Sequence, residues 1–472
     1  MLEQKCSQFY FLEKFLNSKF DDHTNLEIKL NSINIELQGS SQLGLGLGNC
    51  INLSTLAINL NNCSIGDTGV QELSSGLAQC TNLSDLSLYL GYNNIFKDGA
   101  SNLGSSLAKL ANLQSLILSV GNNQIGQDGA SEILIGLANC SKLSKLIIYL
   151  FRNNIRECAW SEVGKMSNLH TLTIQLSDNK IGCFENLHGL CSALAKCNNL
   201  SNLVLILNDN NIDFENVSIF GSTLAKCNKL SNLTLFFGSI NIKLQGSSQL
   251  GLGLGNCINL STLAINLNNC NIGDYGVQEL SSGLAQCTNI SDLSLYLGQN
   301  NIFKDGASKL GSSLAKLAKL QSLILGLGDN QIGQEGASEI LTGLANCSKL
   351  SKLIIYLFRN NILYQCAWSE FGKMSNLHTL TIHLSGNDIG CLKNINELCS
   401  ALAKCNHLSN LVLILNDNNI DFANVSIFGS LAKCSKLSNL TLSFGQLRVS
   451  PAIKKLKQKN LKAKRLVKLQ IY

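Results

Sequence analysis

Apolar residues follow two different periods within a segment that recurs along the chain. In residues 81–110, every second side chain from Leu86 to Leu90 is apolar, which is the period of a strand with one buried face. From Ala100 to Leu110 the apolar residues recur at three- and four-residue steps, the spacing of a helix with one apolar stripe. Each such segment is therefore predicted to form a strand, an asparagine turn and a helix.

One segment of this kind cannot fold alone. Its few apolar side chains, buried at about 1.5–3 kcal/mol each, do not offset the entropy lost on ordering about thirty residues. Neighbouring copies must therefore stack. The copies are contiguous, which predicts a repeat array over residues 21–450. Residues 1–20 are predicted to form an N-terminal helical cap, and residues 451–472 a basic C-terminal cap with a last strand.

The array also contains a longer duplication. The sequence of residues 51–80 returns at residues 258–287 with two substitutions. The seven-repeat block 51–257 is therefore predicted to be duplicated as 258–450.

Each block has one shortened copy, residues 141–166 and residues 348–374, whose helical half is incomplete. Trp160 and Trp368 lie in these copies and are expected to fill the gap. Because they lie behind an aromatic part of the strand half, we expect each block to centre its contact surface there.

The net charge of +6 comes from the end of the chain. Nine of the 37 basic residues follow residue 446, which leaves 28 basic against 31 acidic residues elsewhere. A nearly neutral array argues against a groove that binds nucleic acid along its length. The basic end is interpreted as the polar face of a terminal cap, with a patch for an acidic partner, an anionic membrane or nuclear import as the alternative.

Nineteen cysteines do not indicate a disulfide framework here. Ten of them share one position at the end of the helical half, where other copies carry Leu110, Leu317, Met166 or Met374. A residue that exchanges with leucine and methionine is interpreted as a small buried hydrophobe. No CxxC pair occurs, so no metal site is expected. The chain has no secretory signal and no apolar run long enough to span a membrane, so a cytoplasmic location is predicted.

The pattern LxxLxLxLxxNxIG followed by GxxxLxxxLAxC resembles the leucine-rich repeat family. The period, with a full helix, is similar to the ribonuclease-inhibitor-like subclass, although the strand and turn are two residues longer than is usual. The resemblance implies an α/β fold: a right-handed horseshoe-shaped solenoid with a parallel sheet on the concave face and helices on the convex face. It also implies protein–protein binding by the concave face. In this geometry a buried asparagine in each turn, such as Asn93 or Asn153, should satisfy backbone groups that lack ladder partners.

Strand alternation points the intervening residues outward on the concave face. The outward residues are mostly serine, threonine and asparagine, with grouped aromatic and aliphatic side chains that are typical of protein interfaces. Strand propensity alone also favours such residues. The predicted partner-binding residues are Tyr89, Lys145, Ile147, Tyr149, Phe151, Phe236, Tyr296, Lys352, Ile354, Tyr356, Phe358 and His383.

No catalytic or cofactor motif is found in the sequence. The six histidines are scattered, and the glycines of residues 44–48 form GxGxG at the end of a predicted helix rather than a phosphate loop. We therefore expect a non-enzymatic scaffold without a cofactor that recognises a protein, with two similar binding surfaces if the duplication has a function. The alternatives are a GTPase-activating protein that uses Arg152 or Arg359, as a family with this repeat type does from a loop arginine, and the sensor portion of a larger signalling protein.

Overall fold

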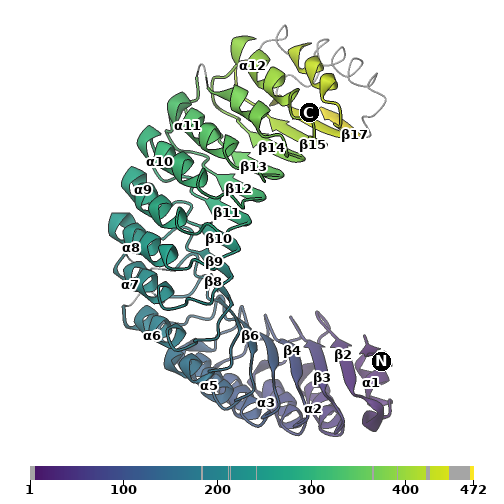
Figure 1. The fold of residues 1–472 in the computed structure, drawn as a ribbon. Helices are drawn as coiled ribbons and strands as arrows, with labels where there is room; N and C mark the ends of the chain where they lie inside the picture. Colours follow the sequence, from purple (N-terminus) through teal and green to yellow (C-terminus); the bar gives the residue numbers. More distant parts are fainter. Residues whose placement is uncertain are drawn as a thin grey trace. The chain divides into compact units, whose positions relative to one another are not determined.

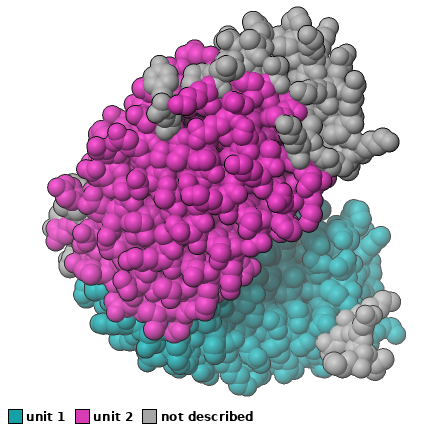
Figure 2. Space-filling view, turned by 45° about the horizontal axis from the view of Figure 1, so that its top comes forward, with its two compact units in different colours: residues 1–236 teal, residues 237–472 magenta. Residues whose placement is uncertain are grey.

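The computed structural model describes residues 6–181, 184–210, 212, 214–240, 242–363, 366–390, 392–420, 426–445 and 468–471. The chain divides into two compact units, residues 1–236 (unit 1) and residues 237–472 (unit 2), which Figure 2 distinguishes by colour. In each unit, parallel strands form one layer and helices cover one side of it (Figure 1).

Unit 1 alternates short strands with helices throughout. Its described elements are β1 (Ser7–Phe9), α1 (Leu12–Leu16), η1 (Phe20–Asp22), β2 (Asn25–Lys29), α2 (Glu36–Gly48), β3 (Thr55–Asn59), α3 (Gly66–Leu77), β4 (Asp85–Tyr89), α4 (Lys97–Leu107), β5 (Ser115–Ser119), α5 (Gly126–Leu137), β6 (Lys145–Tyr149), η2 (Trp160–Lys165), β7 (Thr171–Gln175), α6 (Phe184–Leu194), β8 (Asn202–Ile206), α7 (Phe214–Leu224) and β9 (Asn232–Phe236), where η denotes a 3₁₀ helix.

Unit 2 follows the same alternation. Its described elements are α8 (Lys243–Gly255), β10 (Thr262–Asn266), α9 (Gly273–Leu284), β11 (Asp292–Tyr296), α10 (Lys304–Leu314), β12 (Ser322–Gly326), α11 (Gly333–Ala345), β13 (Lys352–Tyr356), η3 (Trp368–Lys373), β14 (Thr379–His383), α12 (Leu392–Leu402), β15 (Asn410–Ile414), η4 (Ser426–Lys433), β16 (Asn439–Ser443) and β17 (Lys468–Ile471).

Within each unit every strand pairs in parallel with the next strand along the chain. The register aligns equivalent positions, so that Leu86 lies beside Leu56 and Leu116. The inward leucines and isoleucines of the strands are buried against the helices. The predicted fold class, an α/β solenoid in which parallel strands alternate with helices, is therefore confirmed.

The turn asparagines are buried and connect neighbouring repeats. Asn93 is fully buried; its Oδ1 accepts a hydrogen bond from the backbone N–H of Cys63 at 2.9 Å, and its Nδ2 donates to the carbonyl of Leu60 at 2.7 Å. The backbone N–H of Asn93 in turn donates to Oδ1 of Asn123 at 2.9 Å. Each amide thus satisfies backbone groups that the sheet leaves unpaired, as the sequence predicted.

Small residues allow helices of adjacent repeats to approach closely. A Cβ added to Gly76 in α3 would lie 1.8 Å from the carbonyl oxygen of Gly44 in α2. The glycine-rich residues 44–48 therefore belong to a helix, and Gly44 serves packing rather than phosphate binding.

The shortened copies contain six-residue 3₁₀ helices, η2 and η3, in place of α-helices. Trp160 and Trp368 begin them and are buried, with 2 % and 0 % of their surfaces exposed. In unit 2, Trp368 also stacks on Phe371 with ring centroids 6.4 Å apart. The tryptophans fill the space that the missing helical turns leave.

None of the cysteines that the structure describes forms a disulfide, and nearly all of them are buried. The thiol of Cys80 lies 3.3 Å from the carbonyl oxygen of Leu47 in the preceding repeat, and Cys287 contacts Leu254 in the same way at 3.2 Å. Burial raises the pKa of Cys80 to about 11. A thiol of this kind stays protonated, so it packs and donates a weak hydrogen bond.

The chain before the first full repeat contains more than a helix. Strand β1 pairs with β2 and extends the sheet, an element that the sequence pattern did not predict. Phe15 of α1 is buried beneath it, in edge contact with Phe9 at 5.6 Å. At the other end, β17 pairs with β16, while most of the basic segment 451–472 lies outside the described residues.

Candidate functional site

Each regular strand presents three side chains on the face opposite the helices. Most five-residue strands alternate between buried and partly exposed positions, so positions one, three and five form three outward rows. In β12 and β16 the fifth residue, Gly326 or Ser443, is itself buried. The fifth position lies at the carboxyl end of the strand, and this third row carries most of the aromatic residues. It reads Lys29, Asn59, Tyr89, Ser119, Tyr149, Gln175, Ile206 and Phe236 in unit 1, and Asn266, Tyr296, Gly326, Tyr356, His383, Ile414 and Ser443 in unit 2.

In unit 1 the predicted residues gather around β6. Lys145, Ile147 and Tyr149 are its outward side chains, and all are half-buried. Phe151 follows in the turn, where its ring covers Gly121; a Cβ on this glycine would lie 2.3 Å from a ring carbon. Tyr89 on β4 is separated from Tyr149 by Ser119 on β5.

Phe236 stands apart from this group. It is the outward residue at the end of β9, and β7 and β8 lie between its strand and β6. The unit 1 candidates therefore form one cluster around β6, with Tyr89 at its edge and Phe236 at a distance.

In unit 2 the predicted residues come closer together. Lys352, Ile354 and Tyr356 are the outward side chains of β13, and His383 on β14 lies beside Tyr356 in the register. The ring of His383 lies 4.9 Å from that of Phe358 and 6.1 Å from that of Tyr356, between centroids.

His383 is held as part of this aromatic group. Its Nε2 is 2.9 Å from the hydroxyl of Ser385, and burial lowers its pKa below 6.5. A neutral imidazole is therefore favoured near neutral pH. Unit 1 has Gln175 at this position, so the histidine is specific to unit 2.

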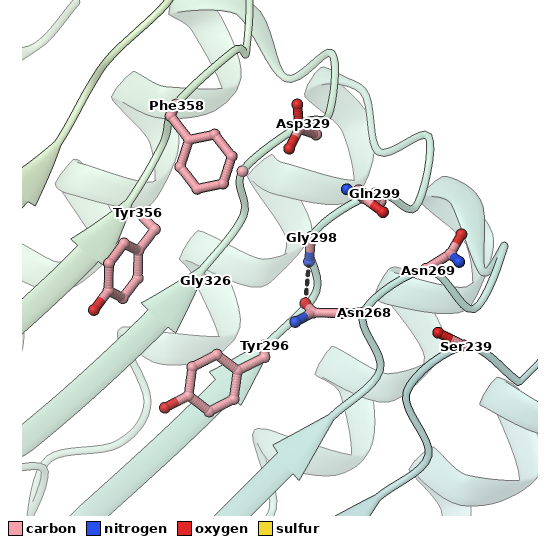
Figure 3. A pocket seen from close by; sticks show the side chains of 11 residues that line it. Ser239, Asn268, Asn269, Tyr296, Gly298, Gln299, Gly326, Asp329, Tyr356 and Phe358 are labelled. Carbon is pink, nitrogen blue, oxygen red and sulfur yellow. Dashed lines mark hydrogen bonds between the residues drawn. The ribbon is translucent and has the colours of Figure 1, made fainter. Parts of the chain in front are cut away.

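Tyr296 and Tyr356 flank a pocket, which we call the tyrosine slot (Figure 3). Tyr296, Gly326 and Tyr356 are neighbours in the register of β11, β12 and β13, so no side chain of β12 stands between the two tyrosines, and the ring of Tyr296 leans over the glycine. The slot has a volume of about 410 Å³. Its lining consists of Ser239, Asn268, Asn269, Tyr296, Gly298, Gln299, Gly326, Gly328, Asp329, Tyr356 and Phe358.

Close packing around the glycines shapes the slot. The ring of Tyr296 leans toward Gly326, where an added Cβ would lie 3.1 Å from its Cδ1. Phe358 covers Gly328, at 2.1 Å from the corresponding Cβ position. Burial raises the pKa of Tyr296 above its ordinary value of 10, and the nearby Tyr356 adds to the increase. The floor of the slot is thus backbone, and its walls are aromatic.

The turns that follow the strands form an edge of the outward face, which we call the rim, and in unit 2 this rim borders the slot. The rim residue, which precedes the buried asparagine, adopts the left-handed conformation, with φ of 54° at Asp329 and 51° at Arg359. Nη1 of Arg359 lies 3.3 Å from Oδ1 of Asp329. In unit 1 the equivalent Arg152 pairs instead with Asp178 on its other side, at 2.9 Å.

Sequence reasoning missed the glycines and the rim. Gly326, Gly328 and Asp329 were absent from the predicted set because only side chains that project outward were considered as contacts. A direct comparison of the two blocks contains the signal: LILSVGNN at 116–123 becomes LILGLGDN at 323–330. Two of its three changes, Ser119 to Gly326 and Asn122 to Asp329, fall on the slot.

No protein-family model matches the chain, and no curated protein is similar enough to it to count as a relative. Within the described residues, no helix is both long and apolar enough to cross a membrane. A fold of this kind does not by itself specify a function, which has to be argued from what the outward residues can bind.

Proposed function

We propose that the protein is a non-enzymatic scaffold that binds a protein partner through the outward face of its parallel sheet. The observation that carries the proposal is the grouping of half-buried aromatic side chains in the third row, around β6 and around β11 to β14. Tyrosine and phenylalanine on a firm backing are the residues that most often dominate binding energy at protein interfaces.

The support of these side chains favours binding over simple strand propensity. Phe151 and Phe358 are fixed by contact with glycines of the preceding turn, and Tyr356 is packed beside His383. Side chains that are already ordered lose little conformational entropy when a partner covers them. Propensity alone would not require glycines to open space beneath the rings.

The proposal also covers the subclass of the repeat, the location of the protein and the number of binding surfaces. The ribonuclease-inhibitor-like subclass is supported by the α-helix in most described repeats. A cytoplasmic location is supported by the buried cysteines without disulfides in the described part of the chain, which suit a reducing compartment. Two similar binding surfaces are supported by the recurrence of Ile147 and Tyr149 as Ile354 and Tyr356.

The alternatives stay predictions. The structure places Arg152 and Arg359, the candidates for GTPase activation, on exposed rim turns, each paired with an aspartate. A paired arginine would have to leave its aspartate to reach a nucleotide, and a GTP-hydrolysis assay decides this. The role as a sensor portion depends on sequence beyond this chain.

The test is affinity capture of partners followed by quantitative mass spectrometry. A variant with Tyr149→Ala, Phe151→Ala, Tyr356→Ala and Phe358→Ala should capture about tenfold less partner than the wild type. This is the effect expected for removing interface anchors. Thermal unfolding of each variant must be measured in parallel, because Phe151 and Phe358 also pack on glycines.

The matched control removes exposed apolar side chains on the helix side. Leu45 in α2 and Leu252 in α8 are equivalent residues with 69 % and 59 % of their surfaces exposed. A variant with Leu45→Ser and Leu252→Ser should keep the partner. Retention of the partner by the aromatic variant, or its loss from the control, would contradict the proposal.

A further inference from the structure

The tyrosine slot differs from the surrounding sheet in its shape. Adjacent strands lie about 4.8 Å apart, so the side chains of Tyr296 and Tyr356 leave the sheet about 10 Å from each other with only Gly326 between them. Every other described residue of the third row of unit 2 carries a side chain at the position that Gly326 occupies in β12. The slot therefore presents two aromatic rings to whatever enters between them (Figure 3).

The charge of the slot is one-sided. Among the described residues that line it, Asp329 is the one ionisable residue apart from the tyrosines, and no lysine, arginine or histidine is among them. The carboxylate of Asp329 lies beside Arg359, with 3.3 Å between the two atoms; the side chain of Arg359 is 73 % exposed and that of Asp329 is 26 % exposed. Such an exposed pair contributes little and leaves the second carboxylate oxygen of Asp329 able to accept another donor.

A cation fits this combination better than an apolar or acidic group. The faces of tyrosine rings attract cations, and a carboxylate at the edge adds a charge-assisted hydrogen bond. An acid would be repelled by Asp329. A purely apolar group would contact the rings but would make no hydrogen bond to the second carboxylate oxygen of Asp329.

Among cationic side chains, arginine matches the slot more closely than lysine. The guanidinium is planar and weakly hydrated, so it stacks on aromatic rings and still presents N–H groups at its edge to a carboxylate. Lysine carries a compact, strongly hydrated charge, which costs more to bring between two rings.

We propose that the tyrosine slot of unit 2 receives an arginine side chain of the partner, stacked between Tyr296 and Tyr356 and hydrogen-bonded to Asp329. The equivalent place in unit 1 does not, because Ser119 fills the gap and Asn122 carries no charge. This inference rests on the proposed function, since it names the chemistry by which the outward face recognises its partner.

The experiment uses the full chain labelled with 3-fluorotyrosine, whose nine tyrosines are assigned by single Tyr→Phe substitutions. Fluorine NMR then follows a titration with N-acetyl-arginine amide. Three matched probes are titrated in parallel: the citrulline analogue, which is a neutral near-isostere, the lysine analogue and the phenylalanine analogue.

The arginine probe should shift the signals of Tyr296 and Tyr356 in a saturable way and leave those of Tyr89 and Tyr149 in place. Gly326→Ser should weaken this binding about tenfold, because it restores the side chain found in unit 1, and Asp329→Asn should weaken it about three- to tenfold. Ser119 shows that serine is tolerated at this point of the repeat, and circular dichroism verifies the fold of each variant.

Several results would overturn the inference. No saturable shift, an equal response at Tyr89 and Tyr149, or unchanged binding by Gly326→Ser would each show that the slot is not the site. Equal binding of the citrulline or phenylalanine probe would exclude charge as the determinant, and equal binding of the lysine probe would exclude the planar fit to arginine.

The two proposals fail in distinguishable ways. If the aromatic variant still captures the partner while the arginine probe binds the slot, protein binding through this face is wrong, and only the preference of the slot for an arginine group stands. If capture is lost but the probe never binds, the binding face stands and the arginine assignment is wrong.

Discussion

In unit 1 the third row of β4, β5 and β6 reads Tyr89, Ser119 and Tyr149, whereas β11, β12 and β13 of unit 2 read Tyr296, Gly326 and Tyr356. The two tyrosines, their strands and their register are the same in both. One serine side chain separates a filled surface from one with a slot. The repeat thus keeps its framework while a single outward position changes what the surface can hold.

The rim changes in a related way. Unit 1 carries Asn122, Arg152 and Asp178 in consecutive turns, and unit 2 carries Asp329, Arg359 and Gly386. The carboxylate has moved from one side of the arginine to the other, toward the slot. The buried differences at Leu83 and Ile290, and at Val163 and Phe371, by contrast exchange one apolar residue for another. The exposed differences therefore alter the charge and shape of the surface, and these buried ones keep the core apolar.

The largest expected effect tests whether the framework is equivalent in the two units. Asn93 and Asn300 make matching bonds, to the N–H groups of Cys63 and Cys270 at 2.9 Å and to the carbonyls of Leu60 and Leu267 at 2.7 and 2.6 Å. Replacing either by alanine should lower the free energy of unfolding by about 3 kcal/mol or more, because several buried backbone groups lose their partners.

Urea unfolding measures this effect separately in each unit. Trp160 lies in unit 1 and Trp368 in unit 2, so a Trp→Phe substitution at one leaves fluorescence from the other. The controls are Asn94→Gly and Asn301→Gly, at exposed neighbours with φ of 53° and 54°, which should change stability little. A large loss in one unit and none in the other would show that the framework is not shared.

A second, smaller effect concerns the phenylalanines on the rim side. Gly121→Ala and Gly328→Ala should each cost about 1–3 kcal/mol, because the added methyl group would lie 2.3 or 2.1 Å from the ring of Phe151 or Phe358. Thermal unfolding measures the loss. Combining Gly328→Ala with Phe358→Ala should cost less than the sum of the two single changes; additive losses would mean that the ring does not rest on the glycine.

A pH effect should appear in unit 2 and disappear with His383→Gln, which copies Gln175 of unit 1. Burial lowers the pKa of His383 below the ordinary 6.5, so the unfolded chain binds a proton more readily than the folded chain. The contribution to stability is complete above pH 6.5 and is lost as the pH falls from 6.5 through the lower pKa of the folded state. No charged residue faces the ring across the register, where Tyr356 and Ile414 flank it.

Thermal unfolding midpoints measured between pH 7.5 and pH 5 test whether stability falls in this direction. The wild type should lose more stability than His383→Gln over this range, after both are normalised at pH 7.5. Parallel curves for the two proteins would contradict it.

The smallest effect distinguishes the rim aspartates. Asp178→Asn and Asp329→Asn should each change stability by less than about 1 kcal/mol, because both ion pairs are exposed. Only Asp329→Asn should weaken binding of the arginine probe. A loss of probe binding in Asp178→Asn would show that the rim acts through general charge rather than through the slot.

Much of the fold could be predicted because the same pattern of strand, turn and helix recurs in many copies along the chain. The same three signals recur together: alternating leucines, the turn asparagine and the apolar stripe of the helix. An ambiguous pattern in one copy can therefore be interpreted from the other copies. Strand β1 was missed because it is a single short strand, stabilised by the sheet beside it rather than by its own sequence. The outward residues of β6 and β13 followed from alternation alone.

The slot could not be predicted in the same way. A pocket depends on what is absent, and Gly326 contributes no side chain to an outward pattern. Its effect appears only when the register places it between Tyr296 and Tyr356, which the sequence pattern indicates only if strands from three repeats are aligned. Comparison of the two blocks at 119 and 326 would have found it.

The central claim, that a few outward residues on a shared framework decide what the surface binds, is tested most directly by moving the slot. In a Gly326→Ser background, Ser119→Gly and Asn122→Asp give unit 1 the arrangement of unit 2. We expect the arginine probe then to shift the fluorine signals of Tyr89 and Tyr149 and no longer those of Tyr296 and Tyr356. Silent signals at Tyr89 and Tyr149 in a folded variant would contradict it.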